Sequence, residues 1–592
     1  RDPLWSRGLG DVYKRQILIT LRRRRDGGMD GNLQFSTVQS NRIAGYTPSG
    51  RIGIRTGRWT LTASGSGSFT PVAESRFTET REQAGQPLPF AGRSDSKSRT
   101  NYGRGHFSAV FDPTPKHTAG FDIEYTERST HMPTLSRTTL GQTQSDSRYR
   151  QHMDGNTLTA TANYIWKIDT LGSQFKLIAD YTRYTSDGDN SYHTTTCAPG
   201  TLRDSLYESA TGSVYDILTA DAGLTRKLPH GLTLRAGLRY TRNDMADKSR
   251  YAAQTQGTWL ALPEYSYDQH YTEQIGAAYA SLEYSAGRWE LSAGLRGEYT
   301  SVASQAFGRS YFGLFPNVSV SRALNALRTW LLVAQWSRNI ERPAFPALNP
   351  ARIRISDYSW QSGNPSLRPT YIHRFSLTAV WKYRYTLTVG GNLHHDLIRE
   401  IAHRDATAPD AVYIRPENHY TENHWFVAAS VPAKITRWWN LSVNAVGVMQ
   451  RIRLNSTDSP ATHYLMFADA TCSFTLPAGF FAEAAYRAQS RLYSGNSEVG
   501  PRHTLSATVK KQLFDKRLTL FCTLSNITGC DWEFASLTDG MRRTIDTRQA
   551  WSGRLWKVGA AWNFRTGKKF RARTVESAAE TQRKRLVKST EQ

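Results

Sequence analysis

Long apolar runs are absent from this chain of 592 residues. No strictly apolar run exceeds five residues, as in 330–334 and 464–468, whereas a membrane-spanning helix needs about 18 to 20. A bundle of membrane helices is therefore excluded. Aromatic residues are not scarce, at 11% of the chain, and they occur throughout it. Intrinsic disorder is excluded as well, because disordered chains are poor in aromatic and β-branched residues.

Cysteine is also scarce. The four cysteines, Cys197, Cys472, Cys522 and Cys530, form no CxxC pair and show no zinc spacing with histidine. The sequence therefore predicts neither a disulfide framework nor a bound metal or other cofactor. The nearest approach to a metal set, His394, His395 and Asp396, is better explained as polar lining, because adjacent strand residues point to opposite faces.

Motifs of catalysis are missing. The chain has no GxSxG elbow, no HExxH helix, no GxxxxGK[ST] phosphate loop and no GxGxxG fingerprint. An enzyme, and hence any catalytic residue, is not expected.

Acidic residues are fewer than basic ones. The chain has 50 Asp and Glu against 75 Lys and Arg, which gives a net charge of +25. Nearly half of the excess lies in residues 1–25 and 565–592, and no basic helix, zinc finger or RNA-binding motif accompanies it. A nucleic-acid partner is therefore not expected. Solvated basic ends are the simpler interpretation.

Alternation with period two is the main feature that is present. In residues 232–240 the even positions are apolar, among them Leu234 and Leu238, and the odd positions are polar or Gly, among them Thr233 and Arg239. This pattern is typical of strands with one dry and one wet face. Stretches 289–299 and 385–394 repeat it.

The spacing of the predicted strands separates a membrane barrel from a soluble sandwich. Even-to-odd joins are tight turns such as Thr56-Gly57 and Ala286-Gly287, whereas five odd-to-even joins, 71–101, 130–155, 187–214, 244–270 and 340–370, exceed 25 residues. Bacterial outer-membrane barrels show this alternation, with short turns in the periplasm and long loops outside. The 22 predicted strands are 31–40, 50–56, 58–70, 102–112, 117–129, 156–168, 174–186, 215–227, 231–243, 271–285, 288–301, 312–324, 328–339, 371–384, 385–401, 419–434, 439–453, 463–476, 479–494, 502–513, 517–529 and 550–565.

The fold class predicted is all-β, a transmembrane antiparallel β-barrel of about 22 strands. A closed sheet gives every backbone N–H and C=O an internal partner in lipid, and about 9 to 11 tilted residues suffice to cross. Tryptophans near strand ends fit the interfacial belt of such barrels. They are Trp59, Trp166, Trp289, Trp330, Trp381, Trp438, Trp439, Trp556 and Trp562.

Three motifs resemble those of TonB-dependent outer-membrane receptors, especially the Bacteroidota-type barrel group. The segment from 341 to 371 resembles the family's loop-to-strand region, although Thr370 stands where many members have an acidic residue. Residues 524–529, Leu-Ser-Asn-Ile-Thr-Gly, resemble its penultimate-strand motif, and residues 17–31 resemble the end of the plug passing into the first strand. The motif residues of the first region are Arg342, Pro343, Asn349, Pro350, Gly363, Asn364, Pro365, Leu367 and Pro369.

The resemblance implies an outer-membrane barrel of 22 strands that imports a bulky solute by TonB-energised plug movement. Residues 1–16 fit no strand and resemble a translated sequencing adapter, so we expect a non-native, adapter-like extension there. The other predicted regions are the end of a plug at 17–29, the barrel at 30–565 and a basic periplasmic tail at 566–592. We interpret the chain as a C-terminal fragment with most of the plug missing. Implied partners are outer-membrane lipid, the TonB complex, a surface lipoprotein and an extracellular small molecule, glycan or peptide.

Ligand binding is expected in the outer loops, where aromatic and basic residues gather. Loop 340–370 holds Arg352, Arg354, Tyr358 and Trp360, which combine contact area with a guanidinium fork for carboxylate or phosphate. Loop packing explains the same residues equally well. Siderophore, cobalamin, glycan and peptide remain open as substrate classes. A passive porin and a non-transporting receptor or adhesin are the alternative functions.

Overall fold

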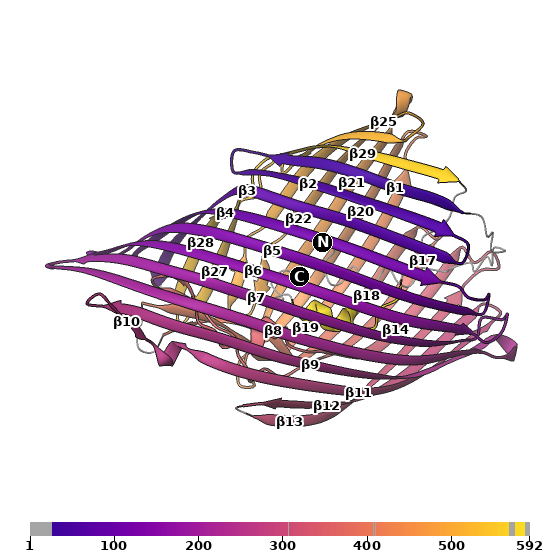
Figure 1. Cartoon of the computed structure of the whole chain (residues 1–592), viewed down its shortest axis with the longest axis horizontal. Helices are drawn as coiled ribbons and strands as arrows, with labels where there is room; N and C mark the ends of the chain where they lie inside the picture. The colour runs from indigo at the N-terminus through magenta and orange to yellow at the C-terminus, as the bar shows by residue number, and fades with distance from the viewer. Residues whose placement is uncertain are drawn as a thin grey trace.

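The strands form one closed antiparallel barrel, seen from the side in Figure 1. The computed structural model describes residues 27–83, 85–305, 307–405, 408, 410–567 and 575–586. The barrel closes between its first and last strands, β1 (Gly28–Gln39) and β29 (Leu555–Gly567), which pair from Gly28 opposite Gly567 to Gln39 opposite Trp556. The predicted fold class, an all-β barrel of 22 strands, is confirmed.

Each remaining barrel strand pairs with its neighbours around the wall. They are β2 (Ile43–Thr56), β3 (Trp59–Gln83), β4 (Gln86–Phe111), β5 (His117–Leu140), β6 (Thr143–Lys167), β7 (Gln174–Ala198), β8 (Thr201–Lys227), β9 (Leu232–Thr255), β11 (Tyr267–Ala286), β12 (Trp289–Ser304), β13 (Gly308–Ala323), β14 (Trp330–Glu341), β17 (Thr370–Trp381), β18 (Tyr385–Arg404), β19 (Val412–Lys434), β20 (Trp439–Arg453), β21 (Ala461–Thr475), β22 (Phe480–Gln489), β25 (Arg502–Leu513) and β26 (Leu518–Ser525).

The other elements lie in the connections. The short strands are β10 (Thr258–Ala261), β15 (Ile353–Ser356), β16 (Ser359–Gln361), β23 (Leu492–Ser494), β24 (Ser497–Val499), β27 (Trp532–Thr538) and β28 (Met541–Arg548). The helical turns are η1 (Pro229–Gly231), η2 (Pro263–Tyr265), α2 (Phe345–Leu348), η3 (Pro477–Gly479), α3 (Glu580–Arg583) and η4 (Lys584–Leu586). Among the described residues, no helix has the length and apolar character to span a membrane.

The two faces of the wall differ as the alternation predicted. On β9, Leu238 and Tyr240 are exposed on one face, whereas Thr233 and Thr241 are buried on the other. On the buried face, hydroxyl side chains bond across strands, as Thr219 does with Thr241 at 3.2 Å. Apolar side chains left exposed by a closed sheet are the surface that lipid would cover.

Most of the tryptophans predicted for an interfacial belt are exposed. Eight of the nine are exposed large hydrophobics, and Trp439 alone among them is half-buried. The rings of Trp330 and Trp381, on neighbouring strands beside the short turns, stack with centroids 5.7 Å apart. This arrangement places indoles at a strand end, as a headgroup-level belt requires.

The prediction of long loops at 71–101, 130–155, 187–214 and 244–270 is largely wrong. In these stretches the strands continue beyond the part of the wall whose outer face is apolar. For example, β3 and β4 remain paired until Gln83 lies opposite Gln86. Residues with high strand propensity, such as Thr and Tyr, extend the ladder. Both faces carry mostly polar side chains, although those on the inner face, such as Ser147 and Tyr149, are buried. We call the end with these extensions the outer end.

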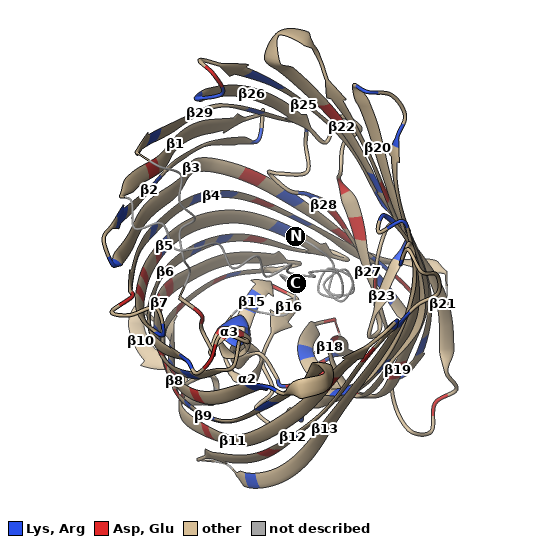
Figure 2. Cartoon of the chain, turned by 90° about the vertical axis from the view of Figure 1, so that its right-hand side faces the viewer, with Lys and Arg blue, Asp and Glu red and all other residues tan. Residues whose placement is uncertain are grey.

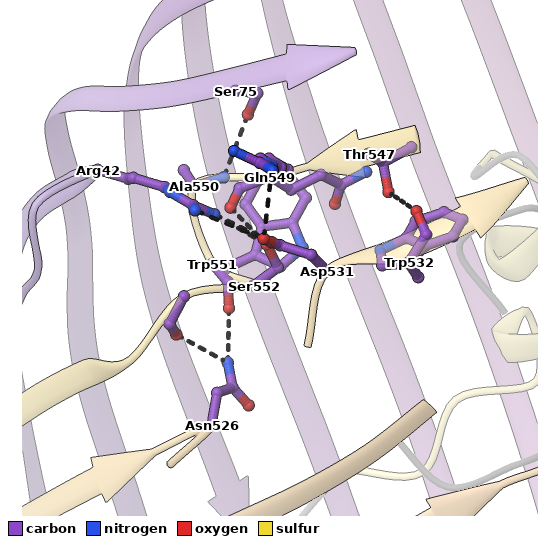
Figure 3. Close-up of polar contacts among 12 residues, drawn as sticks. Arg42, Ser75, Asn526, Asp531, Trp532, Thr547, Gln549, Ala550, Trp551 and Ser552 are labelled. Carbon is purple, nitrogen blue, oxygen red and sulfur yellow. Dashed lines mark hydrogen bonds and ion pairs between the residues drawn. The ribbon is translucent and has the colours of Figure 1, made fainter. Parts of the chain in front are cut away.

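A hairpin of β27 and β28 completes the outer wall at the barrel seam. The pairing of β2 with β3 reaches Ala73, which lies opposite Ile43, the first residue of β2. Beyond that point β28 pairs with β3, from Arg548 opposite Arg76 to Met541 opposite Gln83. Figure 3 shows how this region is held: Asp531 binds Arg42 at 3.0 Å, and the Ala550 N–H donates to Ser75 Oγ at 3.2 Å.

Asn526, from the predicted penultimate-strand motif, has a positive φ of 54° and turns the chain away from β26. Its Nδ2 donates to the carbonyl oxygens of Trp551 at 2.7 Å and Gly553 at 3.2 Å (Figure 3). The motif residue therefore joins the two connections that flank the hairpin of β27 and β28.

Both ends of the chain bear on the predicted regions. Residues 1–16, predicted to be an adapter-like extension, and residues 17–26, predicted to belong to the end of a plug, lie outside the described residues. Gly28 and Met29, assigned to the plug, begin strand β1. Residues 575–586, expected to be solvated tail, instead lie inside the barrel, where Figure 2 shows α3 beside α2. Buried contacts explain the difference, because Ala579 and Arg585 are both enclosed by the wall and the inward loop.

Candidate ligand-binding site at the outer mouth

The connection between β14 and β17 folds into the barrel. Figure 2 shows its elements α2, β15 and β16 inside the wall. We call residues 342–369 the inward loop. Strand β16 pairs in parallel with residues 412–414 of β19, which fixes the loop to the outer wall. The loop therefore narrows the outer mouth above the lumen.

The motif residues at the start of the inward loop hold it to the wall. Arg342 Nη2 donates to Glu298 Oε2 at 2.7 Å and to Thr300 Oγ1 at 2.9 Å. After the turn of Pro343, Phe345 and Leu348 pack in a buried apolar cluster with Leu367. The cluster joins both ends of the loop to side chains of β8, β9, β11 and β12.

Asn349 and Gly363 fix the middle of the loop. Asn349 Oδ1 accepts hydrogen bonds from Tyr267 Oη at 2.7 Å and from the Ala351 N–H at 2.8 Å. A Cβ on Gly363 would lie 2.7 Å from the Ala347 carbonyl oxygen and closer still to that of Asn349. Only glycine fits where the two limbs of the loop pass each other.

Asn364 and the prolines complete the return to the wall. Asn364 donates from its N–H to the Ala347 carbonyl at 2.7 Å and from Nδ2 to the Pro416 carbonyl at 3.0 Å. Pro365 is half-buried and Pro369 is buried directly before β17. Pro350 lines a small outer pocket. The motif therefore shapes the loop, and its prolines and glycine are structural.

Arg352 and Trp360, two of the predicted ligand residues, lie together at an open surface. The Arg352 guanidinium stacks over the Trp360 ring at 4.4 Å and over Tyr265 at 5.2 Å. Its Nη2 lies 3.3 Å from Asp405 Oδ2. Both residues line an outer pocket of about 400 Å³, and Arg352 also lines the large lumen cavity.

Arg354, the third predicted residue, is packed under the loop. It is paired with Asp357 at 2.5 Å and lies 5.4 Å from the Trp360 ring and 5.8 Å from that of Tyr149. Asp357 also accepts a hydrogen bond from Tyr149 Oη at 2.8 Å. The charge of Arg354 is therefore neutralised within the protein, and its position supports Trp360.

Tyr358, the fourth, faces a different cluster. Its ring packs edge-on against Phe90 at 5.8 Å, and the Arg81 guanidinium covers the same Phe90 at 3.7 Å. Arg81 and Arg543 both bind the buried Glu79 at 2.8 Å. Burial alone would raise the pKa of Glu79, but the two guanidinium groups outweigh it, and the net pKa is lowered.

The lumen cavity beneath the loop has a volume of about 1720 Å³. Drug-sized ligands occupy pockets of about 300 to 1,000 Å³, so the lumen admits a much larger solute. One side of the cavity is rich in tyrosine from β7, β8, β9 and β11. These residues are Tyr184, Tyr192, Tyr215, Tyr251 and Tyr267.

The sequence did not indicate the tyrosine wall as one surface. Tyr184 and Tyr215 fall in predicted strands, whereas Tyr192, Tyr251 and Tyr267 fall in stretches predicted as the separate loops 187–214 and 244–270. The rings of Tyr184 and Tyr215 stack at 5.4 Å, and the Tyr251 hydroxyl donates to the Arg352 carbonyl. Burial raises the pKa of Tyr251 to about 12, with the nearby Tyr192 adding to the shift. The phenol is therefore neutral and able to donate at physiological pH. Tyrosines repeating inside polar stretches of period two were the available signal.

The other aromatic and basic residues of 244–270 have two different surroundings. Tyr265 and Tyr267 contact the inward loop, whereas Arg250 and Trp259 are exposed.

His394 lines the lumen, and its Nδ1 lies 2.7 Å from the Glu422 carbonyl oxygen. Within the described residues, no group of three or more His, Cys, Asp or Glu side chains could hold a metal ion.

Solved structures share this architecture. A mutant of the ferric enterobactin receptor PfeA from Pseudomonas aeruginosa has a TM-score of 0.56 and 13% identity, covering 92% of this chain and 81% of that chain. The siderophore receptor PirA from Pseudomonas aeruginosa gives 0.53 and 12% over the same shares. The copper transporter OprC gives 0.59 and 11%, covering 92% of this chain and 81% of that chain. At these identities the likeness concerns the fold alone.

Among curated proteins, none matches the sequence. A family model described as the outer membrane protein beta-barrel family matches residues 166–562, from β6 to β29. The match spans more than half of the chain and covers the barrel wall from the end of β6 to β29, together with the inward loop. This protein therefore belongs to the outer membrane protein beta-barrel family and resides in the outer membrane.

Proposed function

We propose that this protein is the barrel of a receptor that imports a bulky solute across the outer membrane. In this proposal the TonB complex supplies energy by moving a plug in the lumen, and no covalent chemistry is involved. The solute belongs to the siderophore, cobalamin, glycan or peptide class. The names of the solved structures, two siderophore receptors and a copper transporter, support import as a use of this fold.

The observation that carries the proposal is the inward loop above a large cavity. The loop places Arg352 and Trp360 at the mouth, and beneath them lie about 1720 Å³ of lumen. A mouth narrowed by a fixed, aromatic loop suits capture of a ligand before its passage.

Within the site, we assign different tasks to the four predicted residues. Arg352 and Trp360 contact the solute, because they line the pockets. Arg354 and Tyr358 line neither pocket and support the loop through Asp357 and Phe90. Loss of the first pair should reduce affinity in a folded barrel, whereas loss of the second should loosen the loop.

Ligand binding to the purified chain in detergent tests the site. The probes are ferric enterobactin, cyanocobalamin and a mannan oligosaccharide, measured by calorimetry. We expect one of them to bind, and the double change Arg352→Ala and Trp360→Ala to weaken it about tenfold, or about 1.4 kcal/mol. The control pair, Arg250→Ala and Trp259→Ala, removes the same residue types from an exposed surface. Unchanged affinity in the first variant would refute the assignment.

Energy coupling is tested in cells that express the complete reading frame. Uptake of the bound probe is compared in host strains with and without a working TonB complex. Import should require the complex. Equal uptake in both strains would favour a passive porin, and binding without uptake in either would favour a non-transporting receptor or adhesin.

A further inference from the structure

The C-terminal segment, residues 575–586, climbs the inside of the barrel wall. Near the short-turn end, Lys176 Nζ binds Glu576 at 2.6 Å. Next, Asp180 Oδ2 accepts hydrogen bonds from the backbone N–H groups of Ala578 at 2.7 Å and Ala579 at 3.2 Å. Lys176 and Asp180 lie on one face of β7. Further along the segment, α3 lies beside α2 of the inward loop (Figure 2).

At the top of the segment, Arg585 enters a fitted site. Its Nη1 lies 2.5 Å from Glu273 Oε2 and its Nη2 lies 3.5 Å from Glu273 Oε1. Its Nε donates to the Pro343 carbonyl oxygen at 3.0 Å. The guanidinium lies over the Phe345 ring, with Cζ 4.2 Å from the ring centroid. Each guanidinium nitrogen therefore has an acceptor, and the ring adds a cation–π contact.

Without Arg585, the nearest cation to Glu273 on the wall side of the site is Arg342, which pairs more closely with Glu298. Glu273 is buried, with about 1% of the residue exposed, and a buried carboxylate requires a cation. Arg342 donates from Nη2 to Glu298 at 2.7 Å, and its Nε remains 3.9 Å from Glu273. Asn243 Nδ2 donates to Glu273 at 2.8 Å but carries no charge. Arg585 is therefore the principal counter-ion of Glu273.

The arrangement selects a guanidinium over an ammonium. A planar fork reaches both carboxylate oxygens and a carbonyl while its face lies on an aromatic ring. A single ammonium nitrogen cannot occupy all three positions at once. The fit is thus a property of the cavity formed by Glu273, the Pro343 carbonyl and Phe345, and Arg585 is its present occupant.

We propose that the lumen contains a guanidinium-binding site, formed by Glu273, the Pro343 carbonyl and the Phe345 ring, whose resident ligand is Arg585. Free guanidinium compounds and arginine side chains of peptides occupy this site when Arg585 is absent. Because Pro343 and Phe345 belong to the inward loop, occupancy also ties that loop to β11. The site is independent of which solute the barrel imports.

Binding of agmatine, which carries a guanidinium group, tests the site in the full chain in detergent. We expect agmatine to bind the Arg585→Ala variant and not the unchanged chain. Cadaverine, a diamine of similar length, should bind neither. The control is Arg583→Ala, because Arg583 bonds within the segment, to Ser577 Oγ at 2.9 Å. This variant should resemble the unchanged chain.

Cysteine labelling tests whether Arg585 holds the segment. Ala579 is fully buried, so Ala579→Cys, in a background with Cys197, Cys472, Cys522 and Cys530 changed to Ser, should react slowly with a maleimide. Adding Arg585→Ala should raise the labelling rate about tenfold, as expected for a loss of about 1.4 kcal/mol. Adding Arg583→Ala should leave the rate unchanged.

Two results would overturn the proposal. One is equal binding of agmatine to the Arg585→Ala variant and the unchanged chain. The other is a labelling rate of the Ala579→Cys thiol that does not depend on Arg585. A Glu273→Gln change in the Arg585→Ala background should abolish agmatine binding. If that variant fails to fold, the Arg585→Ala results decide, since removing a side chain of the segment leaves the barrel wall intact.

Discussion

Asn349 and Asp247 are 102 positions apart in the chain, yet Asn349 Nδ2 donates a hydrogen bond to Asp247 Oδ1 at 3.0 Å. Asp247 lies on the outer part of β9, and Asn349 lies in the inward loop. The same amide accepts from Tyr267 on β11. This side chain therefore connects the loop to two barrel strands.

Replacing Asn349 by Ala should loosen the inward loop. Tyr267 would lose its acceptor, and an unsatisfied buried polar group costs about 1–3 kcal/mol. Hydrogen exchange of residues 345–365 should accelerate while the membrane part of the barrel stays protected. Asn339→Ala is the matched control, because Asn339 Nδ2 donates to Ser337 Oγ at 2.9 Å on the same strand. Equal exchange in both variants would contradict the assigned role.

Gly363→Ala should displace the loop more strongly. The added methyl meets the backbone carbonyls of Ala347 and Asn349, which cannot move as a flexible side chain can. Overpacking of this kind costs about 1–3 kcal/mol. Protease cleavage within the loop should appear in Gly363→Ala but not in Gly103→Ala, where the new Cβ meets no atom within 4 Å. Resistance of both variants would show that the two limbs can separate without cost.

The outer cluster around Glu79 should weaken at acid pH. Because the folded pKa of Glu79 is lowered from 4.5, its ion pairs stabilise the fold fully above that value. This stability is lost as the pH falls through the lower folded pKa, when protonation leaves Arg81 and Arg543 without their carboxylate. The protection factors of amides at 76–83 and 541–548, which are exchange rates corrected for the intrinsic rate at each pH, should fall on acidification. In Glu79→Gln these protection factors should already be low at neutral pH. A pH dependence of protection in Glu79→Gln like that of the unchanged chain would contradict this account.

The lipid face predicts a contrast between two positions on β18. Val389 is exposed on the apolar face, whereas Asn392 lines the lumen cavity. Arginine on the lipid face of a barrel costs about 2–4 kcal/mol near the membrane centre. Val389→Arg should lower the free energy of unfolding measured in lipid vesicles by that order, and Asn392→Arg should change it much less. Similar losses at both positions would place the lipid boundary elsewhere.

The strands of the membrane band were predictable because their pattern is local. On residues 232–240, apolar and polar positions alternate, and the structure exposes Leu234 and Leu238 while burying Thr233. Above this band, the buried inner face also carries polar side chains such as Ser147, so the alternation of apolar and polar residues fades. Period two therefore provided no indication that β3 and β4 continue to Gln83 and Gln86.

The sequence indicated which residues belong to the inward loop, but not which contacts they make. The resemblance marked Arg342, Asn349 and Gly363, and their contacts with Glu298, Asp247 and Ala347 give each a structural task. Nothing in the order of residues indicated that Arg352 would line a pocket while Arg354 would pair with Asp357. Contacts over such separations depend on barrel closure.

The order of amino acids was enough to establish a closed β-barrel of the outer membrane, because alternation and turn spacing are properties of neighbouring residues. How the mouth and lumen are filled depends instead on contacts that exist only in the folded chain. The inward loop and residues 575–586 meet there because Arg585 balances the buried charge of Glu273, 312 positions away. Such a pairing is set by the folded shape of the wall, which no local pattern encodes.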